Sequence, residues 1–198
     1  MKLYTNPASP FARKARVIAH ELGIKLEEIL VMPFHDENFR KINPLGKIPA
    51  LLLDDGSLLI DSPVICEYLN HLGGGKFFPG MSIWRNDSGR WKALGRQALG
   101  DGVADAAVAY MVEGRQENPH ETTRIRHMAA INAGLDALER TKFAEAPSIG
   151  EISVACALGY IDFRLPEIEW RATRPKLAEW LARFEKYPSM IATAPKAS

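Results

Sequence analysis

The chain has 198 residues, of which 46% are hydrophobic and 25% charged, and its formal net charge is +1. This composition is typical of a globular protein, and the length allows one large domain or two small ones. The small net charge argues against nucleic acid or an acidic membrane as a partner. No apolar run approaches the roughly 20 residues that cross a bilayer. We also expect no secretory signal peptide.

The two cysteines, Cys66 and Cys156, are far apart, and each lies in an apolar helical pattern. We interpret both as buried, reduced core residues, which is consistent with a cytoplasmic location. The five histidines show no spacing typical of metal ligands. The sequence therefore predicts no metal site.

The first elements are a short apolar strand, Lys2–Thr5, and a helix over Pro10–Leu22 that ends at Gly23. Between them lies a loop with two prolines. Pro10 suits the first helical position, so Ser9 is predicted to be the N-cap. The serine hydroxyl and the free N–H groups of the first turn then point at one spot, where the helix dipole favours negative charge.

The predicted first helix has an apolar face and a basic remainder. Its apolar face consists of Phe11, Ala15, Ile18 and Leu22. The basic residues Arg13, Lys14 and Arg16 are interpreted as a solvated face of this helix, not as a nucleic-acid patch.

A second strand is predicted over Lys25–Met32, and a strand, a helix and a strand of these lengths form a right-handed crossover with parallel strands. Residues 33–43 are polar, with room for one short helix. Pro49 then enters another strand, where a proline is not tolerated in the middle of a ladder. The sequence alone does not decide whether the Ile48–Pro49 peptide bond is cis or trans. A cis bond would leave the Ile48 backbone free to pair with an extended peptide.

A hairpin signal at Asp54-Asp55-Gly56 leads to a return strand over Leu58–Ile60. The next helix is predicted to begin with Ser62 as N-cap and Pro63 in the first helical position. Gly73-Gly74-Gly75 ends that helix. A lysine follows these glycines, but the spacing is wrong for a phosphate-binding loop, so we interpret the run as a flexible linker.

The order of these elements is βαβ followed by ββα. Two helix N-termini, at Ser9 and Ser62, lie on either side of Pro49 in this layout, which is that of a thioredoxin-like domain with a mixed sheet. The redox Cys-x-x-Cys motif is absent, and residues 9–12, Ser-Pro-Phe-Ala, stand in its place.

The second half of the chain shows helical patterns only. A long helix, with Trp91 and Tyr110 among its residues, is predicted to reach about Val112, and an apolar stripe from Ile125 to Leu138 marks the next helix. Ser148 and Glu151 form a capping box at the start of a buried helix. A last main helix is predicted to start at Thr173-Arg174-Pro175 and to end at Pro188.

At this point the chain resembles the cytosolic glutathione S-transferase family, in the form with serine at the active-site position. Three motifs match in order and spacing: Ser9-Pro10-Phe11 with Arg13-Lys14, then residues 43–49 (Asn-Pro-Leu-Gly-Lys-Ile-Pro), then Asp61-Ser62. The resemblance implies a thioredoxin-like α/β domain over residues 1–75, a linker over 76–84, and an all-α helical domain over 85–198 that contributes the electrophile pocket.

The resemblance also implies where glutathione binds. Ser9 would contact the sulfur, the Ile48 backbone would pair with the cysteinyl unit, and Pro49 would be the cis-proline of the family. Asp61 and Ser62 would hold the γ-glutamyl end, since a carboxylate suits its ammonium group and a helix N-terminus suits its carboxylate. The glycyl end is assigned to either His35 or Lys47. The implied glutathione-binding set is Ser9, Phe11, His35, Lys47, Ile48, Pro49, Asp61 and Ser62.

Family members with serine at this position donate a hydrogen bond to the glutathione thiolate, so the resemblance implies that Ser9 is the catalytic residue of a transferase. Lowering a thiol pKa of about 8.5 by two units requires roughly 2.7 kcal/mol, which one charge-assisted hydrogen bond and a helix dipole can supply. Thr5 and Asn6, the other polar side chains of the loop, stay open as alternative partners of the thiolate. An apolar electrophile would lie in an interdomain cleft lined by Phe11, Phe34 and Tyr110.

The remaining expectations also rest on the resemblance. They are a cytoplasmic homodimer with a detoxification role, glutathione as co-substrate, no other cofactor, and neither nucleic acid nor membrane as a partner. Two alternatives stay open. One is a glutathione-binding or protein-interaction module without turnover, and the other is a glutathione-dependent peroxidase, because a shared fold does not fix function.

Overall fold

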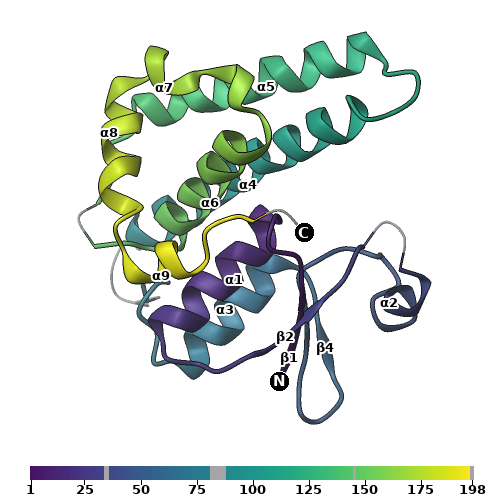
Figure 1. The fold of residues 1–198 in the computed structure, drawn as a ribbon. Helices are drawn as coiled ribbons and strands as arrows, with labels where there is room; N and C mark the ends of the chain where they lie inside the picture. The colour runs from purple at the N-terminus through teal and green to yellow at the C-terminus, as the bar shows by residue number, and fades with distance from the viewer. Residues whose placement is uncertain (34–35, 81–87, 145, 197–198) are drawn as a thin grey trace.

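The computed structural model describes residues 1–33, 36–80, 88–144 and 146–196. A half that contains a sheet is followed by a helical half (Figure 1). The first half contains β1 (Lys2–Thr5), α1 (Pro10–Glu21), β2 (Glu27–Leu30), α2 (Glu37–Ile42), β3 (Ala50–Leu52), β4 (Leu58–Leu59) and α3 (Ser62–Leu72). The second contains α4 (Ser88–Glu113), α5 (Glu121–Glu139), α6 (Ile149–Arg164), the 3₁₀ turn η1 (Pro166–Ile168), α7 (Trp170–Thr173), α8 (Pro175–Phe184) and α9 (Pro188–Ala192).

The four-stranded sheet has the order β2-β1-β3-β4, with β1 and β2 parallel and the other pairs antiparallel. Alternate residues of β1 point to opposite faces. Leu3 is fully buried in the core that includes α1 and α3, while Tyr4 packs against Phe39 of α2 with 5.5 Å between ring centroids. Figure 1 shows α1 and α3 side by side next to the sheet, with α2 apart from them. The predicted mixed sheet of a thioredoxin-like domain is confirmed.

The strands are shorter than the sequence pattern predicts. β2 pairs only over Glu27–Leu30, not over Lys25–Met32, because it is an edge strand whose side chains are largely exposed and whose ends leave the ladder. The predicted hairpin turn is confirmed. Gly56 has a positive φ of 85°, which glycine adopts without steric cost, and its N–H donates to the carbonyl of Leu53.

The prediction that Ser62 is the N-cap of α3 is wrong by one residue. Asp61 has extended dihedrals, and its carbonyl accepts the N–H of Ile65 at 3.0 Å, which makes Asp61 the N-cap and Ser62 the first helical residue. Asp and Ser are equally good N-caps, so the sequence alone does not distinguish the two registers. The hydroxyl of Ser62 nevertheless lies in the first turn of the helix.

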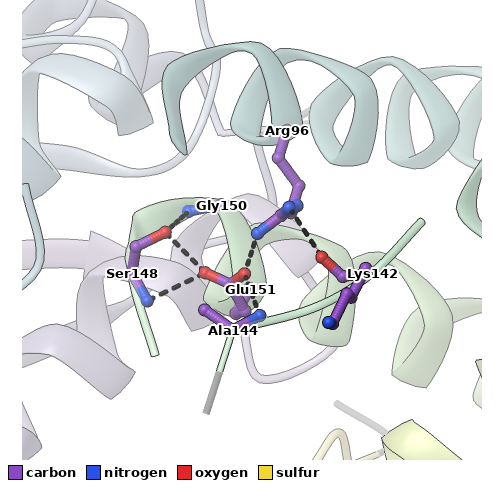
Figure 2. A network of polar contacts seen from close by, with 6 residues as sticks. All are labelled: Arg96, Lys142, Ala144, Ser148, Gly150 and Glu151. Carbon is purple, nitrogen blue, oxygen red and sulfur yellow. Dashed lines mark hydrogen bonds and ion pairs between the residues drawn. The ribbon is translucent and has the colours of Figure 1, made fainter. Parts of the chain in front are cut away.

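Helix α6 is buried along most of its length, and the predicted capping box fixes its start. The Ser148 N–H donates to Oε2 of Glu151 at 2.9 Å, and the Ser148 hydroxyl accepts the Gly150 N–H at 3.1 Å. Glu151 is fully buried, and Arg96 of α4 forms an ion pair with it (Figure 2). The pair neutralises the buried carboxylate, and it joins α4 to the start of α6.

Two details of the helical half differ from the prediction. The residue Ile125 is 61% exposed, so the predicted apolar stripe does not extend to the start of α5, and Trp91 near the start of α4 is 63% exposed. α8 ends at Phe184, four residues before Pro188, and Pro188 begins the short helix α9. A proline both stops one helix and suits the first turn of another, and the prediction allowed only the first role.

The predicted linker over 76–84 begins as an anchored segment. Phe77 is 1% exposed, its N–H donates to Oδ1 of Asn70 in α3 at 2.7 Å, and its carbonyl accepts the N–H of Ile149 at 2.9 Å. This residue therefore joins the end of the first half to the start of α6. Residues 81–84 of the predicted linker lie outside the described residues, so the proposed boundaries at 75 and 85 stay a prediction.

Candidate functional site

Three segments named by the sequence meet at one end of the sheet. β1 leads directly into the loop before α1, and β4 leads into α3. β3 runs antiparallel to both strands, so the loop that precedes β3 enters from the same end. Tyr4 pairs with Ala50 in this register, which places Pro49 beside the end of β1. The N-termini of α1 and α3 and the loop at Pro49 therefore surround one region.

Ser9 occupies the predicted N-cap of α1. Its dihedrals are extended, Pro10 follows in the first helical position, and its Oγ accepts the N–H of Ala12 at 3.2 Å. The loop before it is held by Asn6, whose carbonyl accepts the Ser9 N–H at 2.9 Å and whose Oδ1 accepts the Ala8 N–H at 3.0 Å. Ser9 is half-buried. A hydroxyl and the positive end of a helix dipole therefore lie together, which suits an anion.

Asn43 shapes the loop that carries Lys47, Ile48 and Pro49. Its side chain is 1% exposed, its Nδ2 donates to the Lys47 carbonyl at 2.7 Å, and its Oδ1 accepts the Leu45 N–H at 3.1 Å. The Ile48–Pro49 peptide bond, which the sequence left open, is cis. Lys47 is exposed and Ile48 is half-buried. Sequence analysis noted Asn43 only as part of the motif over residues 43–49. Its role in holding the loop depends on how the loop folds back onto it, which the sequence does not show.

Asp61 and Ser62 form the third part of the region. Asp61 is exposed at the N-cap of α3, and its side chain makes no capping hydrogen bond with the described part of that helix. Ser62 is 3% exposed. An exposed carboxylate beside a helix N-terminus presents both signs of charge, which suits a ligand end that carries an ammonium group and a carboxylate.

The interpretation of Arg13 and Lys14 as solvated is wrong. Lys14 is 1% exposed, and its Nζ lies 2.5 Å from Oδ1 of Asp101 in α4, which also accepts the Ser153 hydroxyl of α6 at 2.6 Å. Arg13 is 4% exposed, and its Nη2 donates to the Met190 carbonyl of α9 at 3.0 Å. A periodicity argument places charges outward, but a long cationic side chain is buried where a partner compensates its charge.

The other predicted residues have different outcomes. Phe34 and His35 lie outside the described residues. Phe11 is half-buried at the start of α1, and the Lys14 Nζ lies 6.0 Å from its ring centroid. Tyr110 is about half a turn around α4 from Asp101, and its hydroxyl accepts from Arg124 of α5 at 2.7 Å. The structure thus brings Tyr110 together with α5, and its place in the cleft stays a prediction.

Electrostatics identify one further carboxylate that sequence reasoning did not assign. Burial raises the pKa of Asp105 in α4 above its ordinary value, and the Asp101 carboxylate raises it further, as Asp61 does to a smaller degree. Lys47 and Lys14 act in the opposite direction. The charges of both glutathione-binding candidates, Lys47 and Asp61, therefore reach Asp105. Sequence reasoning did not assign Asp105 a role, because three of the four charges that act on it come from other segments.

The two cysteines are buried and unreactive in this structure. Burial raises the pKa of Cys66 to about 12 and that of Cys156 to about 11, so neither is a nucleophile near neutral pH. Across the described ranges, no group of three or more metal-ligating side chains is found. No described helix is both long and apolar enough to pass through a lipid bilayer.

A hollow of about 440 Å³ lies elsewhere, between the segment before α6 and the junction of α8 and α9. Its walls include stacked rings of Phe143 and Trp180, whose centroids are 3.9 Å apart. None of the predicted site residues that the structure describes lines it, so this hollow is separate from the region around Ser9.

The chain is similar to known proteins along most of its length. Residues 3–77 match the family model "Glutathione S-transferase, N-terminal domain", and residues 117–183 match "Glutathione S-transferase, C-terminal domain". The chain is 32% identical to the uncharacterized GST-like protein YibF of Escherichia coli K12, over 98% of each chain.

Two solved structures are also similar over nearly the whole chain. One is a glutathione transferase family member from Pseudomonas fluorescens Pf-5 with bound glutathione, at 40% identity and a TM-score of 0.85 over 99% of each chain. The other is a glutathione S-transferase from Methylobacillus flagellatus KT with glutathione bound, at 36% identity and a TM-score of 0.84, covering 98% of this chain and 99% of that one.

Proposed function

Because the chain belongs to the glutathione S-transferase family, we propose that it is a glutathione transferase in which Ser9 stabilises the glutathione thiolate. The observation that carries this proposal is the position of Ser9, at the N-cap of α1 and at the meeting point of the three segments described above. Glutathione lies across that region, and its sulfur faces the hydroxyl of Ser9.

Each end of glutathione has a chemical counterpart in this arrangement. The exposed Asp61 carboxylate receives the γ-glutamyl ammonium, and Ser62 with the N-terminus of α3 receives the γ-glutamyl carboxylate. The Ile48 backbone pairs with the cysteinyl unit as a short added strand. Lys47, which is exposed on the loop held by Asn43, receives the glycyl carboxylate. His35 is the second candidate for that carboxylate.

The reaction requires little covalent work from the protein. The thiol proton of glutathione passes to solvent, and the sulfur anion is stabilised by the Ser9 hydroxyl and the dipole of α1. The sulfur then attacks an electrophilic carbon of an apolar substrate, such as the chlorine-bearing carbon of an aryl chloride. A C–S bond forms, the C–Cl bond breaks, and chloride leaves with the bonding electrons. Phe11 contributes to the apolar wall on this side.

The test is a titration of the thiol of bound glutathione, followed by thiolate absorbance, in the wild type and in Ser9→Ala. We expect the substitution to raise the thiol pKa by about one to two units, since it removes one charge-assisted hydrogen bond. Glutathione binding, measured by calorimetry below the pKa, is expected to change little. Ser57→Ala, in the exposed hairpin turn, is the matched control and is expected to leave both quantities unchanged.

The same measurements separate the alternatives. An unchanged thiol pKa in Ser9→Ala would rule out Ser9 as the activating donor. Glutathione binding without turnover of any electrophile in a panel would identify a binding module. Reduction of an organic hydroperoxide without conjugation of aryl halides would identify a peroxidase.

We further propose a homodimer located in the cytoplasm. Two apolar side chains support the dimer: Val64 of α3 is 48% exposed and Trp91 of α4 is 63% exposed. Their neighbours Glu67 and Arg90 form an ion pair at 2.6 Å, which links the two helices. Sedimentation of the wild type and of Trp91→Glu tests this surface, because a charge in a dimer interface should produce monomers.

A further inference from the structure

Asp105 lies on the face of α4 that is turned toward the N-terminal half. Asp101 identifies this face, because its Oδ1 is 2.5 Å from the Lys14 Nζ of α1. Four residues along an α-helix correspond to about 6 Å of rise and about 40° of rotation. Asp105 therefore projects from the same side as Asp101, one turn further along the helix.

The surroundings of Asp105 come from every segment that borders the proposed glutathione site. The charged groups that act on it are Asp101 of α4, Lys47 of the loop before β3, Lys14 of α1 and Asp61 at the start of α3. Lys14 is already compensated by Asp101, whereas no ion pair of Asp105 is found among the described residues. Asp105 is an exposed residue, and the elements around it nevertheless bury its carboxylate enough to raise its pKa.

The charges on the proposed substrate make this carboxylate relevant. Bound glutathione brings a sulfur anion and two carboxylates against one ammonium group. An electrophile that carries a further negative charge must approach that sulfur with Asp105 and Asp101 close by. Like charges at separations of several ångströms in a partly desolvated site repel by enough to change a rate constant by an order of magnitude.

We propose that Asp105 is a specificity-determining residue that excludes anionic electrophiles, so that the enzyme accepts neutral aryl and alkyl electrophiles. This inference rests on the proposed transferase function. A substrate must then be apolar and also carry no negative charge, and Asp105 of α4 imposes the second requirement.

The experiment compares two electrophiles that differ in one carboxylate, 1-chloro-2,4-dinitrobenzene and 4-chloro-3,5-dinitrobenzoate. The ratio of their kcat/KM values is measured for the wild type and for Asp105→Asn. We expect the wild type to prefer the neutral compound and Asp105→Asn to raise kcat/KM for the benzoate by about tenfold. The kcat/KM for the neutral compound should stay within about twofold. The gain on the benzoate should shrink at high salt, because screening weakens the repulsion.

Glu179→Gln is the matched control. This carboxylate is exposed on α8, so its loss changes the net charge of the protein by the same amount without altering the charge near α4. In Glu179→Gln, the ratio of kcat/KM for the neutral electrophile to kcat/KM for the benzoate should equal that of the wild type. An equal rise in Glu179→Gln and Asp105→Asn would overturn the inference, because overall charge would then explain the effect. An unchanged ratio in Asp105→Asn would overturn it as well.

A binding measurement keeps the inference testable if turnover is absent. The two S-aryl glutathione conjugates, with and without the added carboxylate, are titrated into both proteins by calorimetry. Asp105→Asn should tighten binding of the carboxylate conjugate by about tenfold and leave the other unchanged. Equal changes for both conjugates would overturn the role of Asp105. Failure of glutathione itself to bind the wild type would instead overturn the proposed function.

Discussion

Lys14 of α1 and Asp101 of α4 form an ion pair between the two halves of the molecule, with 2.5 Å between Nζ and Oδ1. The Ser153 hydroxyl donates to the same oxygen at 2.6 Å, so three helices meet at one carboxylate. Ser9 begins the helix that carries Lys14. The pair therefore fixes the helix that carries the proposed thiolate donor relative to α4 and α6.

Replacing Lys14 should be costly because its partner stays in place. Lys14→Met leaves the Asp101 carboxylate, which is 18% exposed, without its cation, and we expect the free energy of unfolding to fall by about 3 kcal/mol. Lys14→Met/Asp101→Leu should recover most of that loss, because no uncompensated charge remains. Urea denaturation measures both. Arg183→Met, which breaks an exposed pair on α8, should cost less than about 1 kcal/mol. Equal losses in Lys14→Met and Arg183→Met would contradict the prediction.

Replacing Lys14 and replacing Asp101 should shift the pKa of the thiol of bound glutathione in opposite directions. Lys14→Met removes a cation from the helix that Ser9 caps and should raise the thiol pKa, while Asp101→Asn removes the anion paired with that cation and should lower it. Each shift is expected to be about half a unit, because the partner partly cancels each charge. Titration of the bound thiol measures both values. A purely structural role for the pair would move the two variants in the same direction.

The buried position of the Arg13 side chain requires a residue without a side chain at Gly159 of α6. A Cβ on Gly159 would lie well inside van der Waals contact with Nη1 of Arg13, and that side chain cannot move without breaking its 3.0 Å bond to the Met190 carbonyl. Gly159→Ala should therefore lower the free energy of unfolding by about 1–2 kcal/mol. On α4, a Cβ added to Gly102 would meet no atom of another segment within 4 Å, so Gly102→Ala should instead stabilise by up to about 1 kcal/mol. Thermal melts of both variants check the opposite signs.

Residues whose roles are local were predictable, and those whose partners are distant in sequence were not. The N-cap position of Ser9 and the Ser148–Glu151 capping box depend on three or four neighbouring residues, and both are confirmed. Lys14 finds its partner 87 residues away, and no periodicity in α1 indicates that contact. The same reason explains why Asp105 was not singled out, because three of the four charges that act on it come from other segments.

The capping box of α6 should be more sensitive at Glu151 than at Ser148. Glu151 is fully buried, accepts from the N–H and the hydroxyl of Ser148 and pairs with Arg96, so Glu151→Ala leaves two donors and a cation unsatisfied. We expect it to lower the free energy of unfolding by about 3 kcal/mol. Ser148→Ala removes the hydroxyl that accepts the Gly150 N–H and donates to Oε2 of Glu151, but it leaves no buried charge unpaired and should cost about 1 kcal/mol. Urea denaturation of both variants gives the comparison, and equal costs would contradict it.

The two cysteines should be silent toward thiol reagents in the folded protein. Burial raises the pKa of Cys66 from 9.0 to about 12 and that of Cys156 from 9.0 to about 11, so both stay protonated and shielded at pH 8. A disulfide reagent should label neither thiol in buffer and both thiols in urea. Fast labelling of the native protein would contradict the buried placement.

The same pKa shifts predict how stability depends on alkaline pH. In the unfolded chain both thiols ionise near pH 9.0, whereas in the folded chain they keep their protons to about pH 11 or 12. Above pH 9 the unfolded state therefore binds fewer protons than the native state, and the free energy of unfolding must fall as the pH rises toward 11. Below pH 9 both states hold these protons, and the thiols contribute no slope. The variant Cys66→Ala/Cys156→Ala is expected to show a shallower decline between pH 9 and 11 in urea denaturation, even if its stability at pH 7 is lower. A decline as steep as that of the wild type would assign the alkaline sensitivity to other groups.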